Sequence, residues 1–205
     1  MKKLTIILFA LCIFAGCNQK EEDTTLNQMN RIVSFLTSSH SPRLIAEADL
    51  PDYMDDDVPP QFYTVYGRAA YRYIVNYYDE GRDSRREVVR GDRVSITYAA
   101  YDFTAYRSVT IAQLYATNDE SLRDAMVEAG WTLDEANRFY VFEPRTVVAG
   151  GGDVISGVSG SLAGCREGDQ VEIYCTSSMA YGDSMVGILE KDTPVYWRVK
   201  IESIE

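Results

Sequence analysis

Apolar and polar residues alternate in the last part of the chain. Within 170–176, Val171, Ile173 and Cys175 alternate with polar or larger side chains. A two-residue period is typical of a strand that buries one face. The same period returns at 195–201, so the sequence predicts two strands near its C-terminal end, joined by a long loop.

A short helix is expected before these strands. After three glycines, apolar residues recur at about helical spacing: Val154, Ile155, Val158 and Leu162. Asp153 is the expected N-cap, and the helix should stop near the glycine that follows the apolar stripe.

Aromatic and β-branched residues predict further strands upstream. The tyrosine-rich segment 61–78 and the segment 94–103 are both assigned to strand. Between them and the C-terminal part lies an expected helical insertion of about 118–138. Asn118 or Asp119 caps its first helix, and 132–135 contains a second capping box. Phe139, Val141 and Val147 are expected to return the chain to the sheet.

The N-terminal region predicts one amphipathic helix. Residues 25–28 fit a capping box, and an apolar stripe follows at helical spacing: Leu26, Met29, Val33 and Leu36. We expect this helix to pack on the domain; a partner-binding helix is the alternative. The acidic stretch 49–60 is expected to be a linker. Its aspartates are assigned to a solvated loop, since their spacing lacks the pattern of a calcium loop.

The first 16 residues are predicted to be a signal peptide. Two lysines precede an apolar run at 4–14 that is too short to span a bilayer. The following Ala15-Gly16-Cys17 resembles the lipobox of bacterial lipoproteins, so Cys17 is the expected lipidation site and 17–60 the lipidated tether, helix and linker. Ordinary secretion is the alternative. The expected location is the cell envelope of a Gram-negative bacterium, lipid-anchored at the outer membrane and facing the periplasm or the surface.

Composition narrows the possible functions. The 205 residues, 46% hydrophobic, suffice for one domain with an extension. The formal net charge of -11 makes nucleic acid a poor partner. Because the single histidine, His40, precedes the domain, Ser-His, Cys-His and His-ligated metal centres are excluded there. Cys165 and Cys175 are expected to be buried thiols, with a disulfide as the alternative.

Four separated motifs carry a family resemblance. They are Val154-Ile155-Ser156-Gly157, residues 162–169, Ala180-Tyr181-Gly182 and residues 195–204. In this order and spacing they resemble the FKBP-type peptidyl-prolyl isomerase domain, over residues 61–205. The resemblance implies an α+β fold, in which a curved antiparallel sheet wraps around a short helix.

The resemblance also implies a site. Prolyl isomerisation twists an amide against a barrier of about 18–20 kcal/mol, and an apolar, water-poor pocket favours the twisted form over the planar one. No cofactor or metal is needed. The partner would be a proline-containing peptide or an envelope protein, with the membrane reached through the lipid anchor. By resemblance, the catalytic residues are Tyr181, Ile155 and Trp197, and the substrate-binding residues are Tyr98, Tyr115, Val154, Val158 and Leu189. The Ile155 N–H and the Tyr181 hydroxyl are the expected donors to substrate.

Three positions depart from the family pattern. Val158 replaces a tryptophan at the pocket floor, Tyr115-Ala116 stands in place of a Phe-Asp pair, and Arg145 replaces an aromatic wall. Each change affects the shape or dryness of the pocket. We therefore expect binding of proline-containing peptides with weak isomerase activity. The alternative is a non-catalytic interaction module with a degenerate pocket.

Overall fold

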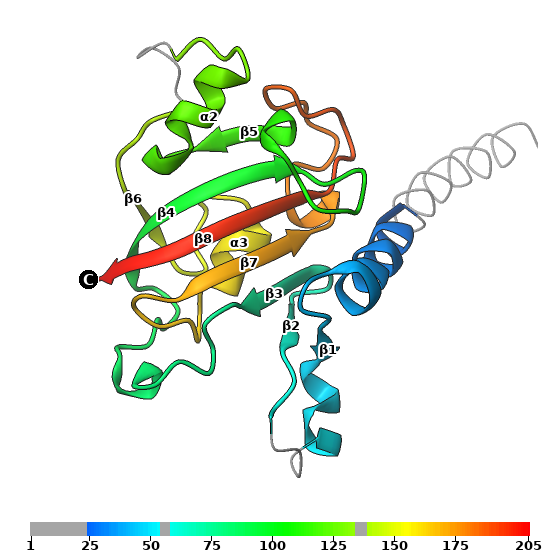
Figure 1. The fold of residues 1–205 in the computed structure, drawn as a ribbon, viewed down its shortest axis with the longest axis vertical. Coiled ribbons are helices and arrows are strands. Elements are labelled where there is room, and N and C mark those ends of the chain that lie inside the picture. The colour runs from blue at the N-terminus through cyan, green and yellow to red at the C-terminus, as the bar shows by residue number, and fades with distance from the viewer. Residues whose placement is uncertain (1–23, 54–57, 134–138) are drawn as a thin grey trace, which may run out of the picture.

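The structure is a computed structural model that describes residues 24–53, 58–133 and 139–205. Within these residues, eight strands form one sheet in the order β1-β2-β3-β7-β8-β4-β5, and β6 pairs with β4 off that path (Figure 1). Among the paired strands of the described residues, only β1 and β2 run parallel to each other. The strands are β1 (Ile45–Ala46), β2 (Phe62–Tyr66), β3 (Ala70–Ile74), β4 (Arg93–Asp102), β5 (Leu114–Thr117), β6 (Arg145–Val148), β7 (Gln170–Cys175) and β8 (Val195–Ile204).

Helices cover both faces of the sheet. The helix α3 (Ser156–Ser161) lies against one face, and α2 (Arg123–Glu128) belongs to the insertion (Figure 1). An N-terminal helix runs over 24–39 and ends in the π-helical turn η1 (Phe35–Ser39). The predicted fold class is confirmed: a curved, mostly antiparallel sheet around a short helix. The short 3-10 segments are η2 (Glu47–Tyr53), η3 (Arg82–Ser84), η4 (Ile111–Gln113), η5 (Glu120–Leu122) and η6 (Ser177–Met179).

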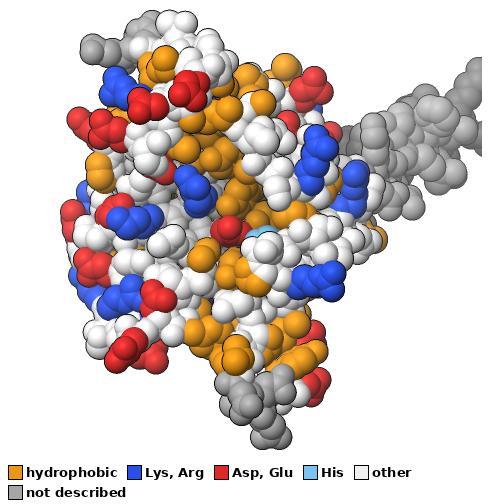
Figure 2. All heavy atoms as spheres, in the orientation of Figure 1, with side chains coloured by type: hydrophobic (Ala, Val, Ile, Leu, Met, Phe, Trp, Pro, Cys, Tyr) orange, Lys and Arg blue, Asp and Glu red, His pale blue; other side chains and the backbone are white. Residues whose placement is uncertain are grey.

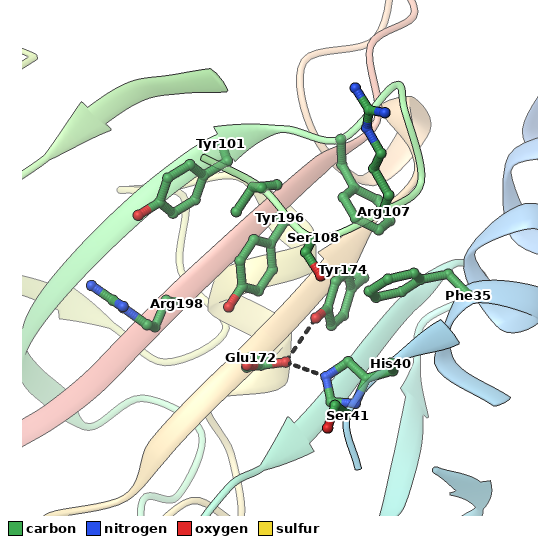
Figure 3. Close-up of a pocket in the computed structure, with 12 residues that line it drawn as sticks. Phe35, His40, Ser41, Tyr101, Arg107, Ser108, Glu172, Tyr174, Tyr196 and Arg198 are labelled. Carbon is green, nitrogen blue, oxygen red and sulfur yellow. Dashed lines mark hydrogen bonds and ion pairs between the residues drawn. The ribbon is translucent and has the colours of Figure 1, made fainter. Parts of the chain in front are cut away.

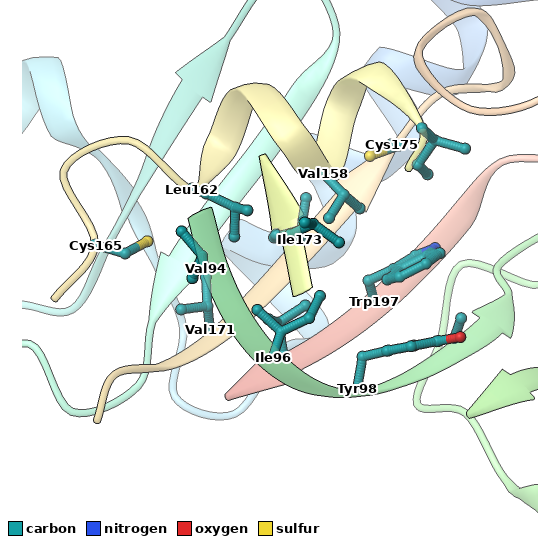
Figure 4. Close-up of a cluster of buried hydrophobic side chains, with 14 of the residues drawn as sticks. Val94, Ile96, Tyr98, Val158, Leu162, Cys165, Val171, Ile173, Cys175 and Trp197 are labelled. Carbon is teal, nitrogen blue, oxygen red and sulfur yellow. The ribbon is translucent and has the colours of Figure 1, made fainter. Parts of the chain in front are cut away.

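Alternation divides the buried side chains into two clusters. On β7, Val171, Ile173 and Cys175 join the cluster under α3, whereas Tyr174 joins the cluster on the opposite face. Figure 4 shows the first cluster, with side chains of the sheet directed toward α3. We call these the inner cluster and the outer cluster. The predicted strands at 170–176, 195–201 and 94–103 are confirmed.

The tyrosine-rich segment is a hairpin of two strands. Gly67 adopts φ 57° between β2 and β3, a left-handed conformation that glycine reaches without a steric penalty. Tyr63 and Tyr71 then face the outer cluster together. Strand was therefore the correct assignment for this stretch, although the turn inside it was missed.

The predicted helix at 154–162 is confirmed, but its expected cap is wrong. Ile155, and not Asp153, occupies the N-cap position of α3, with no side-chain capping bond. The carboxylate of Asp153 instead accepts a hydrogen bond from the Val148 N–H at 3.1 Å. The side chain therefore ties the end of β6 to the loop before α3. Beyond the helix, Gly164 turns the chain with φ 82°.

The N-terminal helix packs on the domain, as expected. Ile32, Phe35 and Leu36 are buried in the outer cluster. Leu26, which the stripe assigned to the buried face, is 56% exposed. The capping box at 25–28 is also wrong, because residue 24 is already helical.

The insertion begins as predicted. The Asp119 side chain caps η5 by accepting from the Ser121 N–H at 3.0 Å, and α2 then continues to a turn at Gly130 with φ 86°. The second capping box at 132–135 lies partly outside the described residues. The aspartates at 55–57 of the acidic linker lie entirely outside them.

The two domain cysteines are free thiols, as predicted. Cys165 and Cys175 are fully buried and unpaired, and burial raises the pKa of the Cys165 thiol to about 11. Among the described residues, no helix has the length and apolar character to cross a bilayer. The same residues contain no group of three or more metal-ligating side chains suited to an ion.

Candidate functional site

The fold brings the predicted site residues together at one end of α3. They come from β4, β5, β8, the N-terminal end of α3 and the loop between β7 and β8. All belong to the inner cluster or pack against it: Tyr98, Tyr115, Val154, Ile155, Val158, Tyr181, Leu189 and Trp197. Residues separated by up to about half of the chain length therefore share one apolar environment.

Two aromatic rings form the wall on the sheet. Tyr98 on β4 stacks on Trp197 of β8, with ring centroids 4.7 Å apart and planes 18° from parallel. Such offset pairs of rings contribute about 0.5–1.5 kcal/mol beyond their buried area. Both rings are nearly completely buried, 7% and 3% exposed. They are packed side by side within the inner cluster (Figure 4).

A chain of three polar groups crosses the site. The Trp197 Nε1–H donates to the Tyr115 hydroxyl at 2.7 Å, and the Tyr115 and Tyr181 hydroxyls share a hydrogen bond at 3.3 Å. Burial raises the pKa of Tyr115 well above its usual value and also raises that of Tyr181. Both side chains are therefore neutral hydroxyls at physiological pH. Tyr181 is the more exposed of the two. It is the last of the three hydrogen-bonded groups and lies at the edge of the inner cluster.

The end of α3 supplies a second donor. Ile155 is the N-cap residue, and its carbonyl accepts from the Val158 and Ser159 N–H groups at 3.1 and 3.0 Å. In the described part of the chain, no group accepts a hydrogen bond from the Ile155 N–H itself. The neighbouring Val154 is half-buried against the inner cluster. One unused N–H thus lies beside an apolar surface.

Val158 and Leu189 complete the packing beneath these donors. Val158 on α3 is fully buried and Leu189 is 1% exposed. Val158 lies on the side of α3 that faces the sheet (Figure 4). In this position it contributes to the core.

The other departures from the family pattern lie around the same site. Ala116 is 7% exposed and offers no carboxylate. Arg145 on β6 is exposed and donates from Nη2 to the Asp153 carbonyl. Its positive charge is close enough to Tyr181 to oppose the rise in that hydroxyl's pKa. The positive charge of Arg145 therefore lies near the Tyr181 hydroxyl, in a site where an apolar pocket would have to exclude water.

Comparison with known proteins bears on this arrangement. Residues 127–202 match the family of FKBP-type peptidyl-prolyl cis-trans isomerases. The match contains α3, Tyr181, Leu189 and Trp197, whereas Tyr98 and Tyr115 lie upstream of it. The FKBP-type match thus covers less than half of the chain and contains three of its four resembling motifs completely and the last nearly so.

Solved structures give a weaker comparison. One match is the crystal structure of the three FKBP domains of wheat FKBP73, at 12% sequence identity and a TM-score of 0.49. The alignment covers 72% of this chain and 52% of the wheat structure, so this chain spans about half the length of that protein structure. No curated protein sequence matches this chain.

A second group of polar residues, missed in the sequence, lies on the opposite face of the sheet. Glu172 on β7 accepts from the Tyr174 hydroxyl at 2.7 Å and binds His40 Nε2 at 2.8 Å (Figure 3). They border a cavity of about 300 Å³. Figure 2 shows that hydrophobic side chains gather over this face, with charged side chains around them.

The histidine is held as a cation. Both ring nitrogens face acceptors, the Pro42 carbonyl at Nδ1 and Glu172 at Nε2, and only an imidazolium donates from both. Burial is the largest single influence and opposes the charge, but the hydrogen bonds to Glu172 and to the Pro42 carbonyl, together with the negative charge of Glu172, outweigh it and raise the pKa of His40. Since these groups satisfy one another, we assign them to attaching the end of the N-terminal helix to β7.

Proposed function

We propose that this chain is an envelope lipoprotein whose FKBP-type domain binds proline-containing peptides and weakly accelerates their cis/trans isomerisation. The proposal is carried by two donors beside one apolar wall: the Ile155 N–H and the Tyr181 hydroxyl, next to the stacked ring of Trp197. A prolyl ring would lie against that wall while a donor holds the substrate carbonyl. Such a wall favours a twisted amide, which has less charge separation than a planar one.

The weakness of the activity follows from what surrounds the donors. The Tyr181 hydroxyl is hydrogen-bonded to Tyr115, so its position is set by the core as well as by a substrate. The charge of Arg145 acts on the same hydroxyl. These observations also support the alternative function, a non-catalytic module. Such a module binds a proline-containing segment, and the cis and trans isomers of that segment then interconvert at the slow uncatalysed rate.

Exchange spectroscopy by NMR on an Ala-Leu-Pro peptide tests the catalytic proposal. We expect the full chain to give a measurable but low exchange rate. Tyr181→Phe should lower that rate by about five- to tenfold, the equivalent of one lost hydrogen bond of about 1 kcal/mol. The matched control is Tyr53→Phe, which removes the hydroxyl of a tyrosine that is 39% exposed on η2.

The outcomes separate the two functions. Peptide binding without any acceleration would favour the interaction module. A rate that Tyr181→Phe leaves unchanged would place the activity at other residues.

We also propose that the chain is anchored by lipid on Cys17. The proposal rests on the apolar run that ends in Ala15-Gly16-Cys17. Intact-mass analysis of membrane-extracted protein should show residue 17 as the N-terminal residue, with added acyl mass. In the Cys17→Ser variant that mass should disappear and the protein should leave the membrane fraction. An unmodified N-terminus at another residue would contradict the proposal.

A further inference from the structure

The side chain of Gln28 is buried against both ends of the loop between β7 and β8, which is far from it in sequence. It lies on the N-terminal helix and is 6% exposed. Its Oε1 accepts a hydrogen bond from the Ser177 N–H, and its Nε2 donates to the Asp192 carbonyl, both at 2.8 Å. Because one partner is a backbone donor and the other a backbone acceptor, the orientation of the amide is fixed.

These two bonds close a ring of hydrogen bonds. Within the loop, the Gly182 N–H donates to the Ser177 carbonyl, and the Asp192 N–H donates to the Gly182 carbonyl, again at 2.8 Å each. The path therefore runs from Gln28 through Ser177, Gly182 and Asp192 and returns to Gln28. The amide of Gln28 is the one member that comes from outside the loop.

The ring holds the segment that carries part of the candidate site. Tyr181 directly precedes Gly182, and Leu189 lies between Gly182 and Asp192. The tip of the loop has little packing of its own, since Met185 is 69% exposed and Ile188 is 54% exposed. Backbone hydrogen bonds at its base therefore contribute much of its order.

The base of this loop is also bent sharply. Gly182 and Asp192 have φ of 58° and 57°, and a left-handed conformation is uncommon for a residue with a side chain. In this conformation the Asp192 carbonyl points toward the helix and meets the Gln28 amide. The contact with the helix thus adds a hydrogen bond at the bend in the backbone at Asp192.

We propose that Gln28 is a positioning residue for the FKBP-type site: through the N-terminal helix it fixes the loop that carries Tyr181 and Leu189. This inference rests on the proposed function of the same site and adds a dependence on a helix that lies outside the matched residues 127–202. Only an amide performs both tasks. Glutamate accepts and cannot donate, and methionine, of similar length, does neither.

The test compares variants of the full chain by two measurements. The first is amide hydrogen exchange at Gly182 and Asp192 without peptide. The second is the affinity for the Ala-Leu-Pro peptide. In Gln28→Met, exchange at both amides should become about tenfold faster and the affinity about threefold weaker, because two hydrogen bonds of ordinary strength are lost. Gln28→Glu should fall between the wild type and Gln28→Met.

Two control variants separate positioning from general loosening. Asn27→Met also introduces methionine, but at the exposed neighbouring position. Ile32→Val weakens the packing of the helix in the outer cluster and leaves the amide in place. Both should keep the exchange rates of Gly182 and Asp192 and the affinity for the peptide.

Each outcome has one meaning. Unchanged exchange at Gly182 and Asp192 in Gln28→Met would overturn the ring of hydrogen bonds as the support of the loop. Faster exchange with unchanged affinity would overturn the positioning role. If the wild-type chain binds no peptide, the proposed function fails, whereas the exchange measurement still decides whether Gln28 orders the loop.

Discussion

Replacement of Asp169 by alanine is expected to lower the free energy of unfolding by about 3–5 kcal/mol, the cost of removing one partner from a buried ion pair. The Asp169 carboxylate is fully buried and accepts from Arg82 through Nε at 2.9 Å and Nη2 at 2.7 Å. It also accepts from the Arg166 N–H at 2.7 Å. Arg82 is itself 5% exposed, so the substitution leaves a guanidinium without this carboxylate partner in a site that water hardly reaches.

Chemical denaturation of the full chain measures this loss. The matched control is Asp83→Ala, which removes a carboxylate that is 95% exposed and 3.8 Å from Arg166. Exposed pairs contribute about 0–1 kcal/mol, so the control should be nearly neutral. A double variant, Asp169→Leu with Arg82→Met, should recover much of the stability that Asp169→Ala loses, because it leaves no buried charge without a partner. A loss below about 1 kcal/mol in Asp169→Ala would contradict the structural role.

The position of this pair explains why it matters for the site. Asp169 precedes β7, and its carbonyl accepts from the Ile201 N–H of β8 at 3.0 Å. The same turn follows α3, whose other end presents Ile155 to the site. The buried pair therefore fixes the register in which helix, strand and loop meet. The sequence does not reveal that the partner of Asp169 is a buried arginine 87 residues away.

Local periodicity carried most of the fold prediction. The strands β4, β7 and β8 each bury one face, and a two-residue alternation makes that face visible in the sequence. The helix α3 was predicted from its apolar spacing, and the start of the insertion from the capping residue Asp119. These signals depend on neighbours within a few residues, and the sequence contains them completely.

Errors arose where a side chain has a distant alternative partner. Asp153 has the residue type of an N-cap, yet its carboxylate binds the end of β6. Leu26 fits the apolar stripe, yet the buried position on that turn belongs to polar Gln28. A buried glutamine does not fit a hydrophobic pattern, and its partners are 149 and 164 residues away. Periodicity holds no information about either contact.

The site residues were identified by family motifs and not by patterns of charge or hydropathy. Their convergence in one cluster follows from the fold. The hydrogen bonds from Trp197 to Tyr115 and on to Tyr181 do not follow from the motifs, because Tyr115 lies outside the matched residues. The constraint that these bonds place on the Tyr181 hydroxyl is visible only in the structure.

Gly157→Ala is expected to destabilise the protein by about 1–3 kcal/mol, the usual cost of overpacking a close-packed interior. An added Cβ would overlap with Cys175 Sγ and would lie 3.0 Å from the Met179 carbonyl oxygen and 3.3 Å from Ala70 Cβ. Two of these neighbours belong to the sheet and one to the segment before Tyr181. The helix must therefore move away from β7 or distort that segment.

Gly160→Ala is the matched control on the same helix. A Cβ there meets no atom within 4 Å, and alanine favours helix over glycine by about 1 kcal/mol, so this variant should be neutral or more stable. Combining Gly157→Ala with Cys175→Ala removes the nearest clash. The double variant should therefore lose less unfolding free energy than the sum of the losses in the two single variants. Denaturant midpoints of the four proteins measure this coupling. Because displacement of α3 also moves the Ile155 N–H, Gly157→Ala should weaken peptide binding as well. Equal stability of the two glycine variants would show that α3 has room against β7 and would remove close packing as the reason for the position of that donor.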